Sequence, residues 1–116
     1  MKYKFLKKCT MEIPNGWINL VSALCKEIQN VINEKNLEDY EVCQVKEKFG
    51  ELRWYDWGGS PEIDEIIEKY RRKSQQTCAS CGKPATKISL GWICPWCDDC
   101  AKLINDKFRN IEEDNL

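Results

Sequence analysis

Two pairs of cysteines, each with two residues between its members, constrain this chain more than any other feature. Cys78 and Cys81 form the first pair, Cys97 and Cys100 form the second, and 15 residues separate the pairs. A two-residue gap lets both thiolates of a pair reach one ion from a tight turn, and four thiolates complete a tetrahedron around Zn2+. The spacing therefore predicts one zinc ion held by all four cysteines.

The predicted zinc is structural rather than catalytic. Four thiolate ligands leave no coordination position for water or substrate. A thiolate site of this kind carries a formal charge of about −2, which needs balancing by neighbouring groups. We expect Lys83, Lys87, Lys102 and the amides that open the following helix to supply that balance.

The other cysteines leave alternatives open. Cys94 and Cys97 also form a C-x-x-C pair, which could ligate in place of the Cys97 and Cys100 pair or serve as a redox pair. The strand-to-helix setting of a redox pair is missing, so zinc is the better use of Cys97. We interpret the single cysteines, Cys9, Cys25 and Cys43, as small buried apolar residues, with Cys25 and Cys43 in packed segments.

Composition excludes several classes of chemistry. The chain has 116 residues, a net charge of −1 and no histidine, which removes His-based acid–base, nucleophilic and metal chemistry. No apolar run approaches the roughly 20 residues of a membrane span, and the lysine-rich start lacks the apolar core of a secretory signal. We therefore expect a cytoplasmic protein whose eight cysteines stay reduced.

Hydrophobic spacing predicts an α+β fold. Periods of three and four indicate helices over residues 14–34 and from residue 61 to about 73, and alternation around Gly50 indicates a β-hairpin over residues 40–57. A short hairpin over residues 86–93 and a closing helix over residues 98–111 complete a zinc-ribbon-like module. We expect an α+β body over residues 1–76 and a zinc-binding module over residues 77–116, packed as one unit.

Alternation also assigns the two faces of the predicted hairpin. Cys43, Val45, Leu52 and Trp54 share one face, and a polar, basic and aromatic set shares the other. The second face is either an amphipathic surface covered by a helix or a binding surface. As a binding surface it would join two tryptophans near the zinc. The candidate binding residues are Lys46, Lys48, Arg53, Tyr55, Trp57, Trp92 and Trp96.

Several strings resemble one family of small proteins from bacteria and their phages. They are residues 44–55 (QVKEKFGELRWY), 77–84 (TCASCGKP), 91–92 (GW) and 97–101 (CDDCA). The family pattern reads VKEKFGGLRFY, then CxxCGxP, then GW and CDxHA, so it supports Cys97 and Cys100 as ligands and leaves Cys94 outside the site. The chain departs from it at Cys100, where histidine is usual, and at Glu51, where glycine is usual. The resemblance implies a bacterial or phage origin and implies no reaction.

We predict a non-enzymatic, zinc-stabilised binding protein. It would capture a host protein or a small nucleotide through the hairpin face, as a phage counter-defence protein could. The alternative is a nucleic-acid-binding regulator of zinc-ribbon type, in which the basic run 71–73 contacts phosphates. An enzyme is less favoured, because no spacing joins Glu47, Glu51 and Asp56 into a catalytic pair, and a purely structural or assembly role is the remaining alternative. Oligomerisation stays open.

Overall fold

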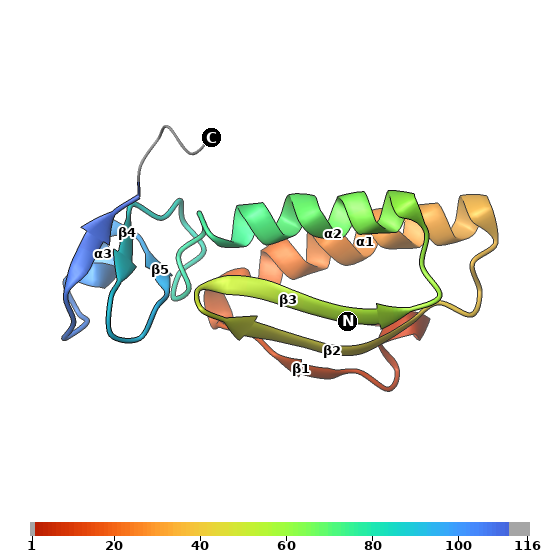
Figure 1. The fold of residues 1–116 in the computed structure, drawn as a ribbon, viewed down its shortest axis with the longest axis horizontal. Helices are drawn as coiled ribbons and strands as arrows, with labels where there is room; N and C mark the ends of the chain where they lie inside the picture. The colour runs from red at the N-terminus through yellow and green to blue at the C-terminus, as the bar shows by residue number, and fades with distance from the viewer. Residues whose placement is uncertain (1, 112–116) are drawn as a thin grey trace.

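The computed structural model describes residues 2–111 and has the predicted α+β class. Residues 1 and 112–116, at the ends of the two predicted parts, lie outside the described residues. Two helices lie on one face of a three-stranded sheet, and a smaller sheet sits at one end of this body (Figure 1). The elements are η1 (Lys4–Leu6), β1 (Thr10–Glu12), η2 (Asn15–Trp17), α1 (Ile18–Lys35), β2 (Glu41–Lys48), β3 (Glu51–Trp57), α2 (Pro61–Ser74), β4 (Lys87–Ser89), β5 (Pro95–Trp96), α3 (Asp98–Ala101) and β6 (Phe108–Asn110).

Helix α1 buries the apolar stripe that its periodicity predicts. Trp17, Val21, Leu24 and Ile28 are all fully buried and form much of the core. The α-helix begins at Ile18, one turn later than predicted, because residues 15–17 form the 3-10 turn η2 instead. The body core therefore rests on a helix whose position the sequence indicates correctly.

Helix α2 begins and ends as its sequence indicates. Ser60 is the N-cap, and its Oγ accepts a hydrogen bond from the Ile63 amide at 3.3 Å. Ile63 and Tyr70 are buried against α1 and the sheet. Glu27 on α1 accepts hydrogen bonds from Lys69 Nζ and from the Tyr70 hydroxyl, so polar contacts also join the two helices.

Strands β2 and β3 form the predicted hairpin around a two-residue turn. Phe49 (φ 53°) and Gly50 (φ 81°) both have positive φ, as the type I′ turn of tight hairpins requires. Val45 and Leu52 are buried and Trp54 is partly buried, as predicted. The prediction is wrong for Cys43, which is exposed, because the register shifts between Val42 and Gln44 and turns the intervening side chain outward.

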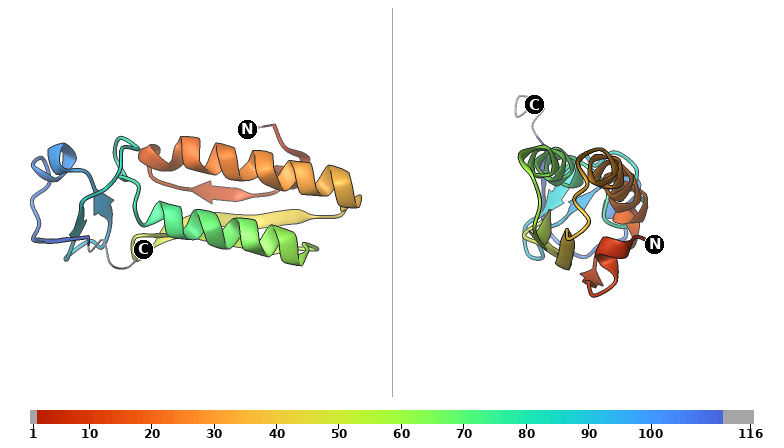
Figure 2. Two further views of the ribbon diagram at one scale, coloured as in Figure 1. Left: turned by 90° about the horizontal axis from the view of Figure 1, so that it is seen from above. Right: turned by 90° about the vertical axis from the view of Figure 1, so that its right-hand side faces the viewer.

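Strand β1 was not predicted. Its three residues run parallel to β2, with Thr10 opposite Gln44 and Glu12 opposite Lys46. The sheet order is β1-β2-β3, and α1 and α2 lie side by side over one face of it (Figure 2). We call the opposite face the open face. The register places on it Thr10, Glu12, Gln44, Lys46, Lys48, Glu51, Arg53, Tyr55 and Trp57.

The predicted closing helix over residues 98–111 is wrong. Helix α3 ends at Ala101, Leu103 is 85% exposed, and residues 108–110 form strand β6 along β4. Asp106 accounts for part of the difference, because its carboxylate accepts hydrogen bonds from the Gly91 and Trp92 amides. Pairing with β6 also covers the edge of β4 that faces away from β5.

The short hairpin near residue 91 exists with a longer connection than predicted. Strand β4 pairs with β5, so that Lys87 lies opposite Trp96 and Ile88 lies opposite Pro95. Trp92 and Ile93 were expected in the returning strand, but they lie in the connection between the strands. Both side chains are exposed there.

Candidate functional site

Four cysteine sulfurs meet in the module at the end of the body. The Sγ atoms of Cys78, Cys81, Cys97 and Cys100 all lie within 4.8 Å of one another, and no disulfide joins cysteines among residues 2–111. A tetrahedral thiolate site with metal–sulfur bonds of about 2.3 Å has sulfur–sulfur edges of about 3.8 Å. The group therefore fits a metal site, and the prediction that these four cysteines converge is confirmed.

Each pair reaches the cluster through a tight turn. In the first turn, the Gly82 amide donates to the Cys78 carbonyl at 3.0 Å, and Gly82 has a φ of 84° that favours glycine. In the second turn, Cys97 precedes α3 as its N-cap, and its sulfur accepts a hydrogen bond from the Cys100 amide at 3.4 Å. These backbone hydrogen bonds fix where the sulfurs point.

Backbone amides, more than lysines, surround the sulfurs. Burial alone would raise the pKa of the Cys78 thiol, but the amides of Cys81, Cys97 and Ser80 lower that pKa to about 7. Two of the lysines expected to balance the cluster are engaged elsewhere. Lys87 donates to Asn110, and Lys102 pairs with Asp99 at 3.8 Å.

Cys94 lies outside the cluster. It is 4% exposed, and burial, then the nearby Glu47 carboxylate, raises the pKa of its thiol to about 12. Its carbonyl accepts a hydrogen bond from the Ser89 amide at 3.0 Å, within the turn that joins β4 to β5. The residue therefore packs the inside of the module, in agreement with its separation from the predicted metal site.

The first cysteine turn is docked directly on the start of α1. The Gly16 amide donates to the Ala79 carbonyl at 2.9 Å, and Trp17 Nε1 donates to the Thr77 carbonyl at 3.0 Å. The hairpin turn contacts the module as well, since a Cβ atom on Gly50 would lie 3.4 Å from Ile93. The module thus contacts the body at η2 and at the hairpin turn.

The register brings three of the predicted binding residues together on the open face. Lys46 lies directly opposite Arg53, and Lys46 Nζ lies 5.6 Å from the ring centre of Tyr55. Tyr55 is 43% exposed. Among residues 2–111, no acceptor hydrogen-bonds to the buried Arg53 Nε atom. Two cations and an aromatic ring therefore share one exposed patch.

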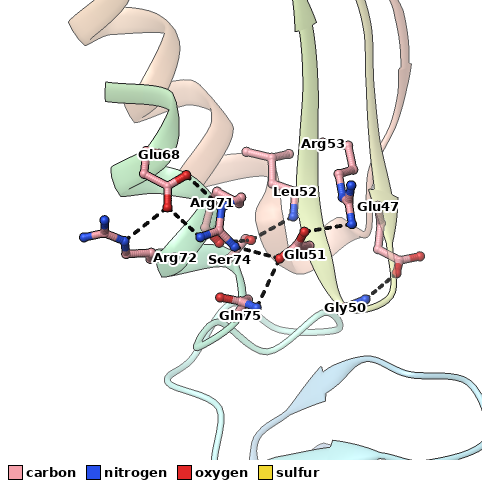
Figure 3. Close-up of polar contacts among 10 residues, drawn as sticks. All are labelled: Glu47, Gly50, Glu51, Leu52, Arg53, Glu68, Arg71, Arg72, Ser74 and Gln75. Atoms are coloured by element: carbon pink, nitrogen blue, oxygen red, sulfur yellow. Dashed lines mark hydrogen bonds and ion pairs between the residues drawn. The ribbon is translucent and has the colours of Figure 1, made fainter. Parts of the chain in front are cut away.

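Glu51 holds Arg53 from the side. Its carboxylate receives Arg53 Nη2 at 2.8 Å and Arg71 Nη1 at 2.7 Å, and Gln75 donates to it at 3.2 Å (Figure 3). The Ser74 hydroxyl, one residue before Gln75, accepts the Leu52 amide at 2.9 Å. The carboxylate that departs from the resembled family pattern thus ties β3 to the end of α2.

A cleft separates the sheet from the module. It has a volume of about 780 Å3, and its walls include Lys46, Glu47, Trp92 and Trp96. Trp96 is held by a hydrogen bond from its Nε1 to Ser89 Oγ at 2.9 Å, whereas Trp92 is 72% exposed. Both predicted tryptophans therefore reach the same hollow as Lys46.

The remaining predicted binding residues lie apart from the cleft. Lys48 lines a smaller hollow of about 290 Å3 at the hairpin turn. Trp57 is 66% exposed and lines a third hollow at the far end of β3, beside Lys4 and Lys8. Sequence reasoning missed Phe49 and Ile93, which line the hollow beside Lys48. An aromatic residue in a predicted tight turn was the available signal for Phe49.

The fold and the cluster define a small α+β protein with a zinc-ribbon-like four-cysteine module. No protein-family model matches the chain, and no curated protein or solved structure matches it either. The family resemblance of the hairpin and cysteine strings therefore stays a prediction. No helix within residues 2–111 combines the length and the apolar character that crossing a membrane requires.

Proposed function

We propose that this chain is a non-enzymatic, zinc-stabilised binding protein that captures an anionic ligand on its open face. Zn2+ suits a four-thiolate tetrahedron with C-x-x-C spacing, and a closed thiolate site stabilises a fold without offering a position for substrate. The absence of histidine from the chain also weighs against acid–base catalysis near neutral pH. The metal would act as a staple, and recognition would fall to the surface beside it.

One observation carries the binding proposal. Lys46 and Arg53 are direct neighbours across β2 and β3 and carry the same charge. Like charges directly opposite each other destabilise a sheet, although Arg53 already pairs with Glu51 at 2.8 Å and Lys46 lies in register with Glu12. An anion lying between the two side chains would turn the repulsion into two favourable contacts.

The surroundings of the cation pair favour a ligand with a flat or apolar group next to its charge. The Tyr55 ring lies beside Lys46, and Trp92 and Trp96 line the cleft that Lys46 borders. Aromatic side chains supply large contact areas and stack on planar groups. A small nucleotide and an acidic segment of a host protein both have this chemistry. The bacterial or phage origin that the resemblance implies fits a protein that captures such a ligand in a host cell.

Calorimetric titration of the metal-loaded protein tests the proposal. The two probes are adenosine diphosphate and a short glutamate-rich peptide. Binding of at least one probe should weaken about tenfold, or by about 1.4 kcal/mol, in Lys46→Ala and in Arg53→Ala. Arg72→Ala is the matched control, because Arg72 is an exposed arginine on α2, in the helix layer. If neither probe binds, or if Arg72→Ala weakens binding equally, the open face is not an anion site.

The nucleic-acid alternative has less support. Within the basic run 71–73, Arg71 contacts Glu68 and Glu51, and Arg72 contacts Glu68. Lys73 Nζ lies 5.0 Å from the ring centre of Tyr70. Phosphate-driven binding to DNA or RNA would weaken steeply with added salt, which a titration between about 50 and 200 mM salt would detect.

A further inference from the structure

Phe49 occupies a turn position whose backbone conformation disfavours large side chains. Its φ of 53° lies in the left-handed region, where a residue with a Cβ atom is strained and where hairpin turns prefer asparagine, aspartate or glycine. The ring is 64% exposed, so core packing does not compensate for the strain. Backbone strain that packing does not explain is characteristic of functional positions.

The exposed ring faces other exposed apolar side chains across a hollow. Phe49, Trp92 and Ile93 line the hollow of about 290 Å3 at the hairpin turn, together with Glu47, Lys48 and Gly91. Trp92 is 72% exposed and Ile93 is 40% exposed. Neighbouring apolar side chains that stay in water and surround a concave site mark an interaction surface. The volume lies at the lower end of the range for small-molecule sites, which suits a single bulky side chain.

Basic side chains lie beside the hollow and favour a partner that carries negative charge. Lys48 Nζ lies 5.7 Å from the Phe49 ring centre, and Lys46 and Arg53 follow along the same open face. Lys46 and Lys48 are two residues apart on β2, about 7 Å along the strand. An apolar socket thus lies one side chain away from three cations, among which Glu51 lies opposite Lys48 and contacts Arg53. Trp92 and Glu47 line both this socket and the larger cleft, so the two hollows are neighbours.

We propose that the ligand of the open face is a peptide segment of a partner protein. A bulky apolar side chain of that segment enters the hollow lined by Phe49, Trp92 and Ile93, and acidic residues beside it lie along Lys48, Lys46 and Arg53. This inference rests on the proposed anion site and names its ligand class. A nucleotide would satisfy the cations and leave the socket empty, whereas an acidic, apolar segment uses both.

Selection from a random peptide display library on the immobilised, metal-loaded protein tests this inference. Enriched peptides should pair acidic residues with one aromatic or large aliphatic residue. Synthetic copies are then titrated against four variants. Phe49→Asn and Ile93→Ser should each weaken binding at least about tenfold, and Lys48→Ala should weaken it about threefold. Leu103→Ser should leave affinity unchanged, because Leu103 is an exposed apolar residue of the same module that does not line the hollow.

Phe49→Asn is informative because it separates recognition from folding. Asn-Gly is the preferred pair for this turn, so the variant should unfold at the same temperature as the wild type or a higher one while losing peptide affinity. If Phe49→Asn lost affinity and also unfolded at a lower temperature, the affinity of Ile93→Ser would decide whether the hollow binds the peptide.

Each other outcome overturns the inference. One is the absence of an enriched motif, and another is enriched peptides whose affinity does not depend on Phe49 or Ile93. Binding to anionic lipid vesicles that Phe49→Asn abolishes would assign the hollow to a membrane surface. A concentration-dependent dimer that Phe49→Asn abolishes would assign it to a second copy. Failure of the anion site gives a different result. In that case Arg53→Ala leaves the affinities for the nucleotide and the peptide both unchanged, whatever Phe49→Asn does.

Discussion

Gly16 lies so close to Cys78 that a Cβ atom at position 16 would fall 2.0 Å from the Cys78 carbonyl oxygen. The contact involves backbone on both sides, so no side chain can rotate away. Gly16→Ala should therefore push the first cysteine turn off the start of α1. We expect the free energy of unfolding, measured in urea on metal-loaded protein, to fall by about 3 kcal/mol.

Gly91→Ala is the control for that substitution. A Cβ atom there would lie 3.0 Å from the Asp106 carboxylate oxygens, which belong to a side chain that can move. We expect a loss below about 1 kcal/mol. Equal losses in the two variants would mean that the module and the body are less tightly joined than the contact at Gly16 indicates.

The cysteines themselves give a second prediction. Cys97→Ser should abolish stoichiometric zinc binding, because it removes one of four clustered ligands. Cys94→Ala should retain one zinc per chain, because Cys94 lies outside the cluster. Native mass spectrometry after purification at neutral pH measures both. Zinc retained by Cys100→Ser and lost by Cys94→Ala would assign the site to the other C-x-x-C pair, Cys94 and Cys97.

Local signals predicted most of the body. Trp17 and Ile28 fall on one helical stripe, Ser60 and Pro61 open α2, and Gly50 marks the hairpin turn, each within a few residues of chain. The convergence of the cysteines was predictable for a different reason. Metal ligand spacing has few geometric solutions, so the pattern constrains contacts across 15 intervening residues.

The misses are elements that depend on distant partners. Strand β1 has three residues and exists because β2 offers it an edge. Residues 98–111 have a helical pattern, yet pairing with β4 and the Asp106 carboxylate bonds to two amides outweigh that local preference. Cys43 was assigned to the wrong face because one bulge reverses alternation. The hollow beside Phe49 could not be predicted, because it forms where the hairpin turn contacts Ile93 and no local sequence pattern encodes that contact.

A third prediction concerns Glu51, whose side chain is 16% exposed and lies between Arg53 and Arg71. Glu51→Gln removes the charge that both guanidinium groups contact. We expect the free energy of unfolding to fall by about 2 kcal/mol, because the variant leaves two half-buried cations side by side. Glu62→Gln is the control. Glu62 pairs with Lys35 at 3.5 Å and both side chains are about half exposed, so this substitution should lower the free energy of unfolding by less than about 0.5 kcal/mol.

Glu51→Gln also tests the anion site. Glu51 competes with any external anion for Arg53, so its neutralisation should strengthen binding of a probe that Arg53→Ala weakens. A variant with unchanged stability would show that the contacts in Figure 3 are incidental, and weaker anion binding would show that Glu51 orients Arg53 more than it competes for it.

The last prediction concerns acid stability. The hydrogen bond from Lys69, followed by that from Tyr70, lowers the pKa of Glu27 below its ordinary value. The folded protein therefore holds this proton less tightly than the unfolded chain, whose glutamates titrate near about 4.3. The contribution of Glu27 is fully present above that value and is lost as pH falls through the lower, folded pKa. Because the carboxylate is 35% exposed, we expect the contribution to stay below about 1 kcal/mol.

Urea unfolding of Glu27→Gln and wild type between about pH 7 and pH 3 measures this contribution. The variant should be less stable at pH 7, and the two curves should converge as pH falls. Loss of metal from the thiolates in acid affects both proteins, so the difference between the curves isolates Glu27. Glu34→Gln, an exposed carboxylate on the same helix, should follow the wild-type curve. A constant gap between Glu27→Gln and wild type at every pH would contradict the proposed linkage, because the lost stability would then come from packing rather than from charge.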